Sequence, residues 1–454
     1  MTSGCEEEAL FSVWKYTQNL PVYSDPHLIP FAASYFNWFF YYIYGNVAKL
    51  SLAWLHADSR WLPTICRVLS LAFALVGVGV CWLVLDELNP RQFFFSWHKK
   101  LAWSLLLIAN PLSGFWLLTT RPDIGALVLE LTGLLFLLRC LRTSRWEEIA
   151  YAALFLYGAW AFKHNFIAIW MGGCFVLLML RKWQAFTLLI TICLGLVFIT
   201  LAFGGSVYRF SLFFSQIHCQ YRFVSSFGFL FSALRKMPFL FLSLLGLVLY
   251  GPVKITRLAV ANPIFLMLLV ATILTFSLGF IFSGKQGAVD YYFLPAALYS
   301  GLLLAKLADF LRPTFFHLGL ALACLISSAG VGFVLSGHYG AVDWRSFYSP
   351  QLELAEKLPS FPGPVFVSDR TGNLPWIQTK PPYFVVAFTY EMDEKAGEWH
   401  EHGGWEGLLR EGYFVTVVTS PYNPIESSLL QNYALAYQDK QHAYYVRRPI
   451  DRHQ

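Results

Sequence analysis

The stretch LPTICRVLSLAFALVGVGVCWLVLD, residues 62–86, decides the fold class. A lipid-spanning helix needs about 20 consecutive, mostly apolar residues at a rise of about 1.5 Å each, and this run is long enough. Because unpaired backbone groups in lipid are costly, such runs are expected to be helical. Further runs that meet or approach this length are residues 101–118, 123–142, 184–204, 238–253, 261–283, 291–310 and 314–336.

One apolar stretch, residues 148–181, is too long for a single span. Lys163-His164-Asn165 interrupts it, which indicates two short helices joined by a polar turn at the membrane face. With these two, the sequence predicts an all-α polytopic membrane domain of about ten transmembrane helices, together with interfacial helices.

The composition agrees with a membrane protein. Only 13% of the residues are charged and 57% are hydrophobic, whereas soluble domains carry about 25% charged residues. Residues 338–454 have a net charge of −4, which leaves +10 for residues 1–337. Positive charge in short loops between apolar runs indicates anionic lipid head groups rather than nucleic acid.

The distribution of Lys and Arg predicts the orientation, because basic residues concentrate in cytoplasmic loops. It places residues after 337 outside, and we expect a multi-pass protein of a bacterial plasma membrane with an extracytoplasmic C-terminal domain. The set assigned to the cytoplasm is Arg91, Lys99, Lys100, Arg139, Arg142, Arg145, Arg181, Lys182, Lys254, Arg257, Lys306 and Arg312; the smaller outer set is Arg121, Lys163, Arg209, Arg222, Arg235, Lys236 and Lys285.

Residues 28–56 are rich in Tyr, Trp and Phe, which favour the membrane–water interface. If this segment lies flat, the N-terminal residues and the loop Thr119–Asp123 share the outer side. If it spans, they lie on opposite sides. We favour the flat, interfacial helix pair, so residues 1–60 are expected to form a first outer loop with interfacial helices, followed by a transmembrane domain over 61–337.

After Gly337 the composition becomes that of a soluble domain, and we expect a small α/β domain over 338–454. The predicted strands are 364–369, 383–388, 413–418 and 443–448. The predicted helices are 403–412, which Gly412 would end, and 424–433.

The unusual polar residues fall on the predicted outer face. Glu6-Glu7-Glu8 and Asp123 each also fit an ordinary helix N-terminus, where acids suit the dipole, and Lys163 also fits a snorkelling side chain. Together, however, they describe two carboxylate sites among several cations. Cations suit a phosphate-bearing lipid, and a carboxylate suits deprotonation of a hydroxyl nucleophile.

Several stretches, in this order, resemble the GT-C class of membrane glycosyltransferases, the polyprenyl-phosphate-sugar-dependent group related to protein O-mannosyltransferases and lipid A aminoarabinose transferases. They extend over nearly the whole chain, and the resemblance lies in their combination. They are EEEALFSVWKYTQNLPVYSDP (6–26), IPFAASYFNWFFYYIYG (29–45), TTRPDIGALVLEL (119–131), AFKHNF (161–166), GAVDYYFLPA (287–296) and SDRTGNLPWIQTKPPYF (368–384).

The resemblance implies a catalytic base in the first outer loop, for which Glu6 is the best match and Glu7 and Glu8 are alternatives, and a second acid, which Asp123 matches. It implies phosphate-binding cations at Arg121 and Lys163, to which we add Lys285. Asp25, His164, His218 and Asp290 are expected to support the site. A divalent metal ion is left open as a cofactor. The resemblance also implies a transmembrane helix before the first acidic loop, which this sequence is expected to lack because it begins five residues before Glu6.

The function implied is an inverting transfer of a sugar from a polyprenyl-phosphate-linked donor to an acceptor of unknown identity at the outer membrane face. The alternatives are a transporter or lipid-handling protein without chemistry, and an inactive GT-C homologue. A transporter predicts polar residues near mid-membrane and inverted repeats, and neither is visible in the sequence.

Overall fold

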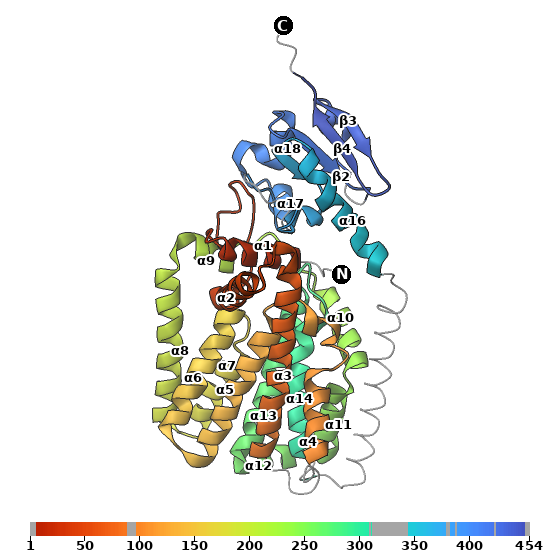
Figure 1. Cartoon of the computed structure of the whole chain (residues 1–454). Helices are drawn as coiled ribbons and strands as arrows, with labels where there is room; N and C mark the ends of the chain where they lie inside the picture. The colour runs from red at the N-terminus through yellow and green to blue at the C-terminus, as the bar shows by residue number, and fades with distance from the viewer. Residues whose placement is uncertain are drawn as a thin grey trace.

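The computed structural model describes residues 6–88, 97–307, 310, 344–377, 382–385, 388–421 and 424–449. Its first part is a bundle of α-helices, and its last part contains a small sheet that lies beyond one end of the bundle (Figure 1). The expected mostly helical fold with a small C-terminal α/β part is confirmed. The predicted span 314–336 lies outside the described residues.

The bundle contains four stretches that are long and apolar enough to cross a membrane among the described residues: Ser59–Leu88, Asp123–Thr143, Trp183–Phe203 and Pro263–Ser283. The expected number of about ten spans stays a prediction. The helices of the bundle are α3 (Leu62–Leu88), α4 (Trp97–Ile108), α5 (Asp123–Thr143), α6 (Trp146–Phe162), α7 (Ala168–Met179), α8 (Trp183–Phe203), α10 (Phe223–Lys236), α11 (Pro238–Tyr250), α12 (Pro252–Ala261), α13 (Pro263–Ser283) and α14 (Leu294–Leu307).

Two predicted runs are not single helices. In the run 101–118, α4 ends at Ile108, and a 3₁₀ helix, η2 (Gly114–Leu118), follows. The Asn110 side chain accepts hydrogen bonds from the Leu112 and Ser113 amides, at 2.9 and 2.8 Å, and so forms a turn in place of the next helical turn. The run 291–310 begins with a second 3₁₀ helix, η3 (Asp290–Phe293), before α14.

The stretch 148–181 forms α6 and α7, with the polar turn between them at residues 163–167, as expected. This turn is brought close to the start of α5 because the two helices pack tightly. A β-carbon added at Gly125 of α5 would lie 2.5 Å from the ring of Phe162. Only a residue without a side chain allows this approach.

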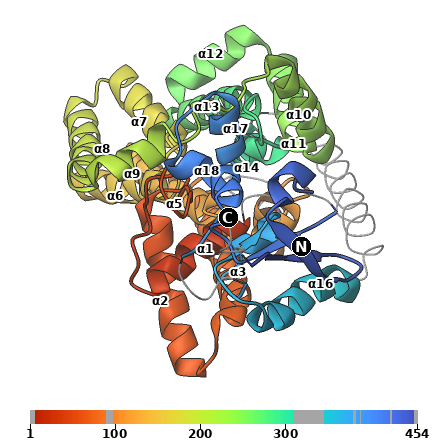
Figure 2. The same cartoon turned by 90° about the horizontal axis from the view of Figure 1, so that it is seen from above.

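Two helices lie across the end of the bundle that faces the C-terminal part. They are α1 (Glu6–Thr17) and α2 (Trp38–Leu55), and Figure 1 shows α2 almost end-on whereas Figure 2 shows its full length. The Asn37 side chain caps α2 by accepting from the Trp38 amide, and it also donates to the Trp160 carbonyl of α6, both at 2.8 Å. Figures 1 and 2 show that α2 lies across the bundle rather than along it, as we favoured. The expected pair of helices in residues 28–56 is wrong, however, because residues 28–37 form a loop and α2 is the one helix of this segment. A further short helix, α9 (Gly205–Phe213), follows α8 at this end.

The C-terminal part contains α16 (Trp344–Lys357), β1 (Val365–Val367), α17 (Tyr390–Lys395), α18 (Gly404–Arg410), β2 (Thr416–Thr419), β3 (Tyr433–Gln438) and β4 (Ala443–Arg447). The sheet order is β1-β2-β4-β3, with β1 and β2 parallel and the other neighbours antiparallel.

Two predictions for the C-terminal part are wrong. The described residues of 383–388 form no strand, and the Val385 amide instead donates to the Pro30 carbonyl of the N-terminal loop at 3.0 Å. The predicted helix 424–433 is only a 3₁₀ turn, Ser427–Leu430, followed by β3. The Asp439 side chain closes the β3–β4 hairpin by accepting from the Gln441 and His442 amides at 2.8 and 2.7 Å, so pairing with β4 overrides the helical pattern.

Candidate active site

The acidic triplet and the loop before α5 meet at the end of the bundle that faces the C-terminal part. The Glu6 carboxylate accepts from the Thr120 amide at 2.9 Å and from Nε and Nη2 of the Arg67 guanidinium, each at 3.2 Å. Glu6 is fully buried. The N-terminal acids and the segment that leads to Asp123 therefore converge, which the flat position of α2 permits.

The centre of the site is a buried ion pair. Asp123 begins α5 after Pro122, and Lys163 follows the last residue of α6. The Lys163 Nζ donates to Asp123 Oδ1 at 2.5 Å, and both side chains are less than a tenth exposed. The other Asp123 oxygen is buried and has no hydrogen-bond partner among the described residues. A second donor, such as a substrate hydroxyl, would satisfy it.

Aromatic rings contact two cations of the site, Arg121 and Lys163. The Arg121 guanidinium lies 4.5 Å from the ring centroid of Trp116 and 5.4 Å from that of Tyr291. The Lys163 ammonium lies 5.0 Å from the Tyr291 ring and 5.1 Å from the Tyr292 ring. Such cation–π contacts stabilise a buried positive charge, and the Tyr291 ring contacts both Arg121 and Lys163.

These cations line a cavity of about 140 Å³, whose wall also includes Lys285, His164 and Gln216. The Lys285 ammonium donates to the Gln216 side chain at 2.5 Å, and burial lowers the pKa of this lysine. Burial, followed by the charges of Lys163 and Lys285, lowers the pKa of His164 to about 4. His164 is therefore a neutral group at pH 7, and the positive charge of the cavity comes from Arg121, Lys163 and Lys285.

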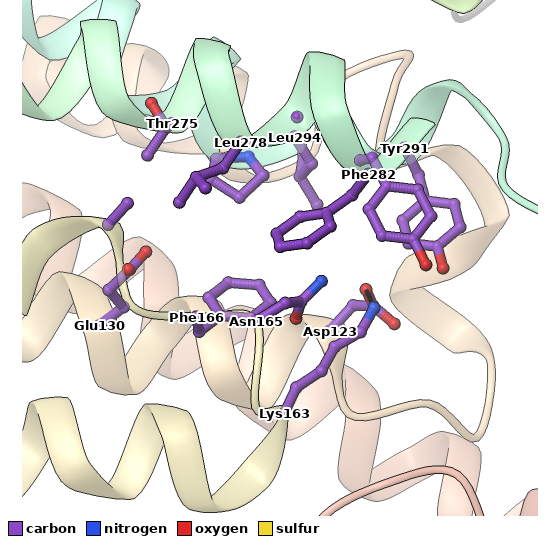
Figure 3. Close-up of a pocket in the computed structure, with 14 residues that line it drawn as sticks. Asp123, Glu130, Lys163, Asn165, Phe166, Thr275, Leu278, Phe282, Tyr291 and Leu294 are labelled. Carbon is purple, nitrogen blue, oxygen red and sulfur yellow. Dashed lines mark hydrogen bonds and ion pairs between the residues drawn. The ribbon is translucent and has the colours of Figure 1, made fainter. Parts of the chain in front are cut away.

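A smaller cavity of about 30 Å³ shares Lys163 and Tyr291 with the first and leads deeper between the helices. Figure 3 shows Asp123, Lys163 and Tyr291 at one end and Glu130 at the other, with apolar side chains between them. Glu130 lies on α5 and accepts from the Tyr299 hydroxyl at 3.1 Å and from the Ile169 amide at 3.3 Å.

The other two acids of the triplet are also buried. Glu8 accepts from the Phe388 amide at 2.7 Å, and Phe388 lines the larger cavity. The Glu8 carboxylate therefore contacts a residue of the cavity wall directly, whereas the Glu6 carboxylate contacts Arg67 and Thr120, which do not line the cavity. Consecutive helical residues are rotated by about 100°, so Glu6 and Glu8 face different sides of α1.

Three residues that we expected to support the site do not line the cavities. Asp25 forms a local pair with His27, His218 contacts Asp393 and Glu398 of the C-terminal part at 3.0 and 3.3 Å, and Asp290 binds Lys236 at 2.6 Å. His164, by contrast, lies in the cavity wall.

Among the residues that the structure describes, no three His, Cys, Asp or Glu side chains are grouped so as to hold a metal ion. The buried partner of Asp123 is instead the Lys163 ammonium.

No protein-family model matches the sequence, and a search of curated protein sequences finds no match either. Solved structures do match. ArnT from Cupriavidus metallidurans bound to undecaprenyl phosphate is 15% identical, with a TM-score of 0.58 over 98% of this chain and 94% of that one. The Archaeoglobus fulgidus oligosaccharyltransferase in complex with Zn and sulfate is 14% identical, with a TM-score of 0.58 over 98% of this chain and 69% of that one. These neighbours are GT-C glycosyltransferases.

The chain has the GT-C fold. The archaeal oligosaccharyltransferase AglB in complex with an inhibitory peptide and a dolichol-phosphate agrees with this, at 12% identity and a TM-score of 0.51 over 91% of this chain and 65% of that one. At these identities the likeness concerns the fold. Any proposal for the chemistry of this chain must therefore be argued from its own residues.

Sequence reasoning missed several residues of the candidate site. Tyr291 and Tyr292 lie within GAVDYYFLPA, and Arg67 lies within the apolar run 62–86. The isolated charge of Arg67 in the run 62–86 was the available signal, because an ionisable residue in such a run needs a partner. The same argument applies to Glu130 in α5.

Proposed function

We propose that the chain is an inverting glycosyltransferase that moves a sugar from a polyprenyl-phosphate-linked donor to an acceptor hydroxyl. The observation that carries this proposal is the cavity lined by Arg121, Lys163 and Lys285, of which Lys163 pairs with the Asp123 carboxylate of the adjoining smaller cavity, at one end of a GT-C bundle. The described residues that line this cavity include three basic side chains and no carboxylate, which suits the phosphate of such a donor.

In this proposal the three cations bind the lipid phosphate. The acceptor oxygen attacks the anomeric carbon while the bond between that carbon and the phosphate oxygen breaks. Because the negative charge on the departing phosphate grows during the reaction, cations placed beside it stabilise the transition state more than the ground state. Asp123 orients the acceptor through its second, unpartnered oxygen.

The base that removes the acceptor proton comes from the acidic triplet. The resemblance pointed first to Glu6, but both oxygens of this carboxylate already accept hydrogen bonds from the Arg67 guanidinium or the Thr120 amide, and neither of these residues lines the cavity. Glu8 is bound by the amide of Phe388, a residue of the cavity wall. We assign the base to Glu8, with Glu7 and Glu6 as the alternatives to be tested beside it.

The topology is part of the same proposal. The C-terminal part lies beyond one end of the bundle (Figure 1), and its residue Phe388 lines the cavity. We place this end on the outer side of a bacterial plasma membrane. The acceptor would reach the cavity between α1 and the C-terminal part.

The test measures release of undecaprenyl phosphate from undecaprenyl-phosphate-linked radiolabelled sugars in membranes that contain the full chain. We expect Glu8→Gln to lower turnover by about a hundredfold or more, since a positioned general base contributes about 10²–10⁴-fold, and Asp123→Asn to lower it by at least about tenfold. Glu147→Gln, on the first turn of α6 at the opposite end, is the matched control.

Unchanged turnover in Asp123→Asn and in all three triplet variants (Glu6→Gln, Glu7→Gln and Glu8→Gln) would reject the proposed mechanism. Loss in Glu6→Gln alone would move the base to Glu6 and leave the reaction type in place.

A further inference from the structure

A second pocket lies at the opposite end of the bundle from the candidate active site. It has a volume of about 530 Å³ and is formed by the turn between α5 and α6 and the turn between α7 and α8. Its lining includes the basic side chains of Arg145, Arg181 and Lys182, and no carboxylate lines it. We call it the basic pocket.

The charges of the basic pocket differ from other charges at this end. Arg142 binds Glu87 at 2.9 Å, and Lys100 binds Asp86. Within the described part of the chain, neither Arg145 nor Arg181 has an ion-pair partner, and the Lys182 ammonium donates only to uncharged oxygens, the Ser144 hydroxyl at 3.1 Å and the Leu141 carbonyl at 3.5 Å. Glu148 of α6 lies near Cys140 of the pocket wall, but none of the three cations forms an ion pair with it. Three cations around one hollow attract an anion.

Two helix starts add to this field. Arg145 precedes α6 and Lys182 precedes α8, and neither helix has a side-chain cap at its N-terminus. The first amides of a helix bear partial positive charge. The carboxylates of Glu147 and Glu148 in the first turn of α6 offset this charge there, whereas the first turn of α8 contains no acid. The pocket therefore combines side-chain and backbone donors for an oxyanion.

Exposed tryptophans and an apolar helix surface surround the basic pocket, as at a membrane interface. Trp146 and Trp183, the first residues of α6 and α8, line it and are 68% and 58% exposed, and tryptophan concentrates at the level of lipid head groups. The α8 wall continues through Ala185 and Leu188. Only 11% of the apolar stretch of α8 is buried inside the molecule, so this helix presents its side chains to lipid.

The pocket also lies at the depth where two candidate membrane spans end, because α5 ends at Thr143 and α8 begins at Trp183. We propose that the basic pocket is a binding site for the phosphate of an anionic phospholipid, with the acyl chains along α8. The site is independent of the proposed glycosyl transfer.

The experiment is native mass spectrometry of the purified full chain in detergent, titrated with phosphatidylglycerol or phosphatidylcholine. We expect saturable one-to-one binding of phosphatidylglycerol and weaker binding of phosphatidylcholine. The variant Arg145→Gln/Arg181→Gln should bind phosphatidylglycerol about thirtyfold more weakly, since each basic residue near a membrane surface contributes roughly fivefold. It should leave phosphatidylcholine binding unchanged.

The matched control is Lys254→Gln/Arg257→Gln. It removes two exposed basic residues of α12, at the same end of the bundle (Figure 1), and should change phosphatidylglycerol binding by less than about threefold. The variant Arg145→Lys/Arg181→Lys keeps the charge and should keep most of the binding. Because both arginines are exposed, the single variants should fold and show roughly fivefold effects each.

Three results would overturn the proposal. The first is unchanged phosphatidylglycerol binding in the double variant, and the second is an equal loss in the α12 control, which would reduce the effect to general electrostatics. The third is displacement of the lipid by millimolar inorganic phosphate, which would show a free-anion site.

Discussion

The two ends of the helical bundle hold their charged side chains in different ways. At the end that faces the C-terminal part, Asp123 and Lys163 form an ion pair in which both side chains are less than a tenth exposed. At the opposite end, in the pair of Lys100 with Asp86, the aspartate is 42% exposed. The sequence presents both as charges between apolar runs. The two pairs differ in burial. A charge that is kept away from water needs a partner, whereas an exposed charge is also stabilised by water.

The largest effect should come from breaking the buried pair. Lys163→Met leaves the Asp123 carboxylate buried without its counter-charge and should lower the free energy of unfolding by about 3–5 kcal/mol. Lys100→Met breaks the exposed pair and should cost less than about 1 kcal/mol. Both are measured by unfolding the purified chain in mixed micelles of rising SDS content. Equal losses would show that burial does not distinguish the two ends.

A smaller effect should follow from spoiling the close packing beside the pair. Gly125→Ala places a methyl group 2.5 Å from the buried ring of Phe162, and overpacking of this kind costs about 1–3 kcal/mol. Gly79→Ala on α3 meets nothing within 4 Å and should be neutral or stabilise by about 0.5–1 kcal/mol through helix propensity. Thermal unfolding of both variants in detergent compares the two positions, and a destabilised Gly79→Ala variant would contradict this interpretation.

The smallest effect should be a pH dependence at the cavity end. The pKa of His164 is about 4 in the folded chain, below its ordinary value of 6.5. The unfolded chain therefore binds this proton more readily, and stability is lost as pH falls from about 6.5 towards 4. At pH 5 the loss should be about 1 kcal/mol, reduced because His164 is partly exposed to the cavity.

The measurement is the melting temperature at pH 7 and pH 5. His164→Gln should show a smaller decrease between the two than the native chain does. His98→Gln, which removes an exposed histidine of α4 at the other end, serves as the control and should behave like the native chain. If His164→Gln shows the same decrease in melting temperature as the native chain, other groups cause the pH dependence.

Apolar length and interruptions predicted much of the fold. The break at Lys163-His164-Asn165 predicted the α6–α7 turn because three polar residues cannot continue a span. The aromatic content of residues 28–56 predicted the flat position of α2. Local patterns failed where partners distant in sequence decide the structure. The strand β3 forms because it pairs with β4, and the sequence YALAYQ (433–438) does not by itself identify that partner.

The candidate site was predicted in part for the same reason. Asp123, Arg121 and Lys163 stand out because each is a charge at the end of an apolar run, and the structure brings them together. Tyr291 did not stand out, since a tyrosine near a span end is ordinary for an interface residue. Its contact with two cations depends on how η3 lies against α5 and α6, which spacing along the chain does not encode.

The environment of Glu8 is completed by a residue 380 positions further along the chain. The Phe388 amide donates to this carboxylate at 2.7 Å, and the nearby Val385 and Glu401 amides donate to the carbonyls of Pro30 and His27. A chimaera that joins this helical bundle to the C-terminal part of another GT-C protein would thus replace part of the proposed site together with that C-terminal part. These contacts between the helical bundle and the C-terminal part are kept when both parts come from the same protein. They are lost when only one of the two parts is exchanged.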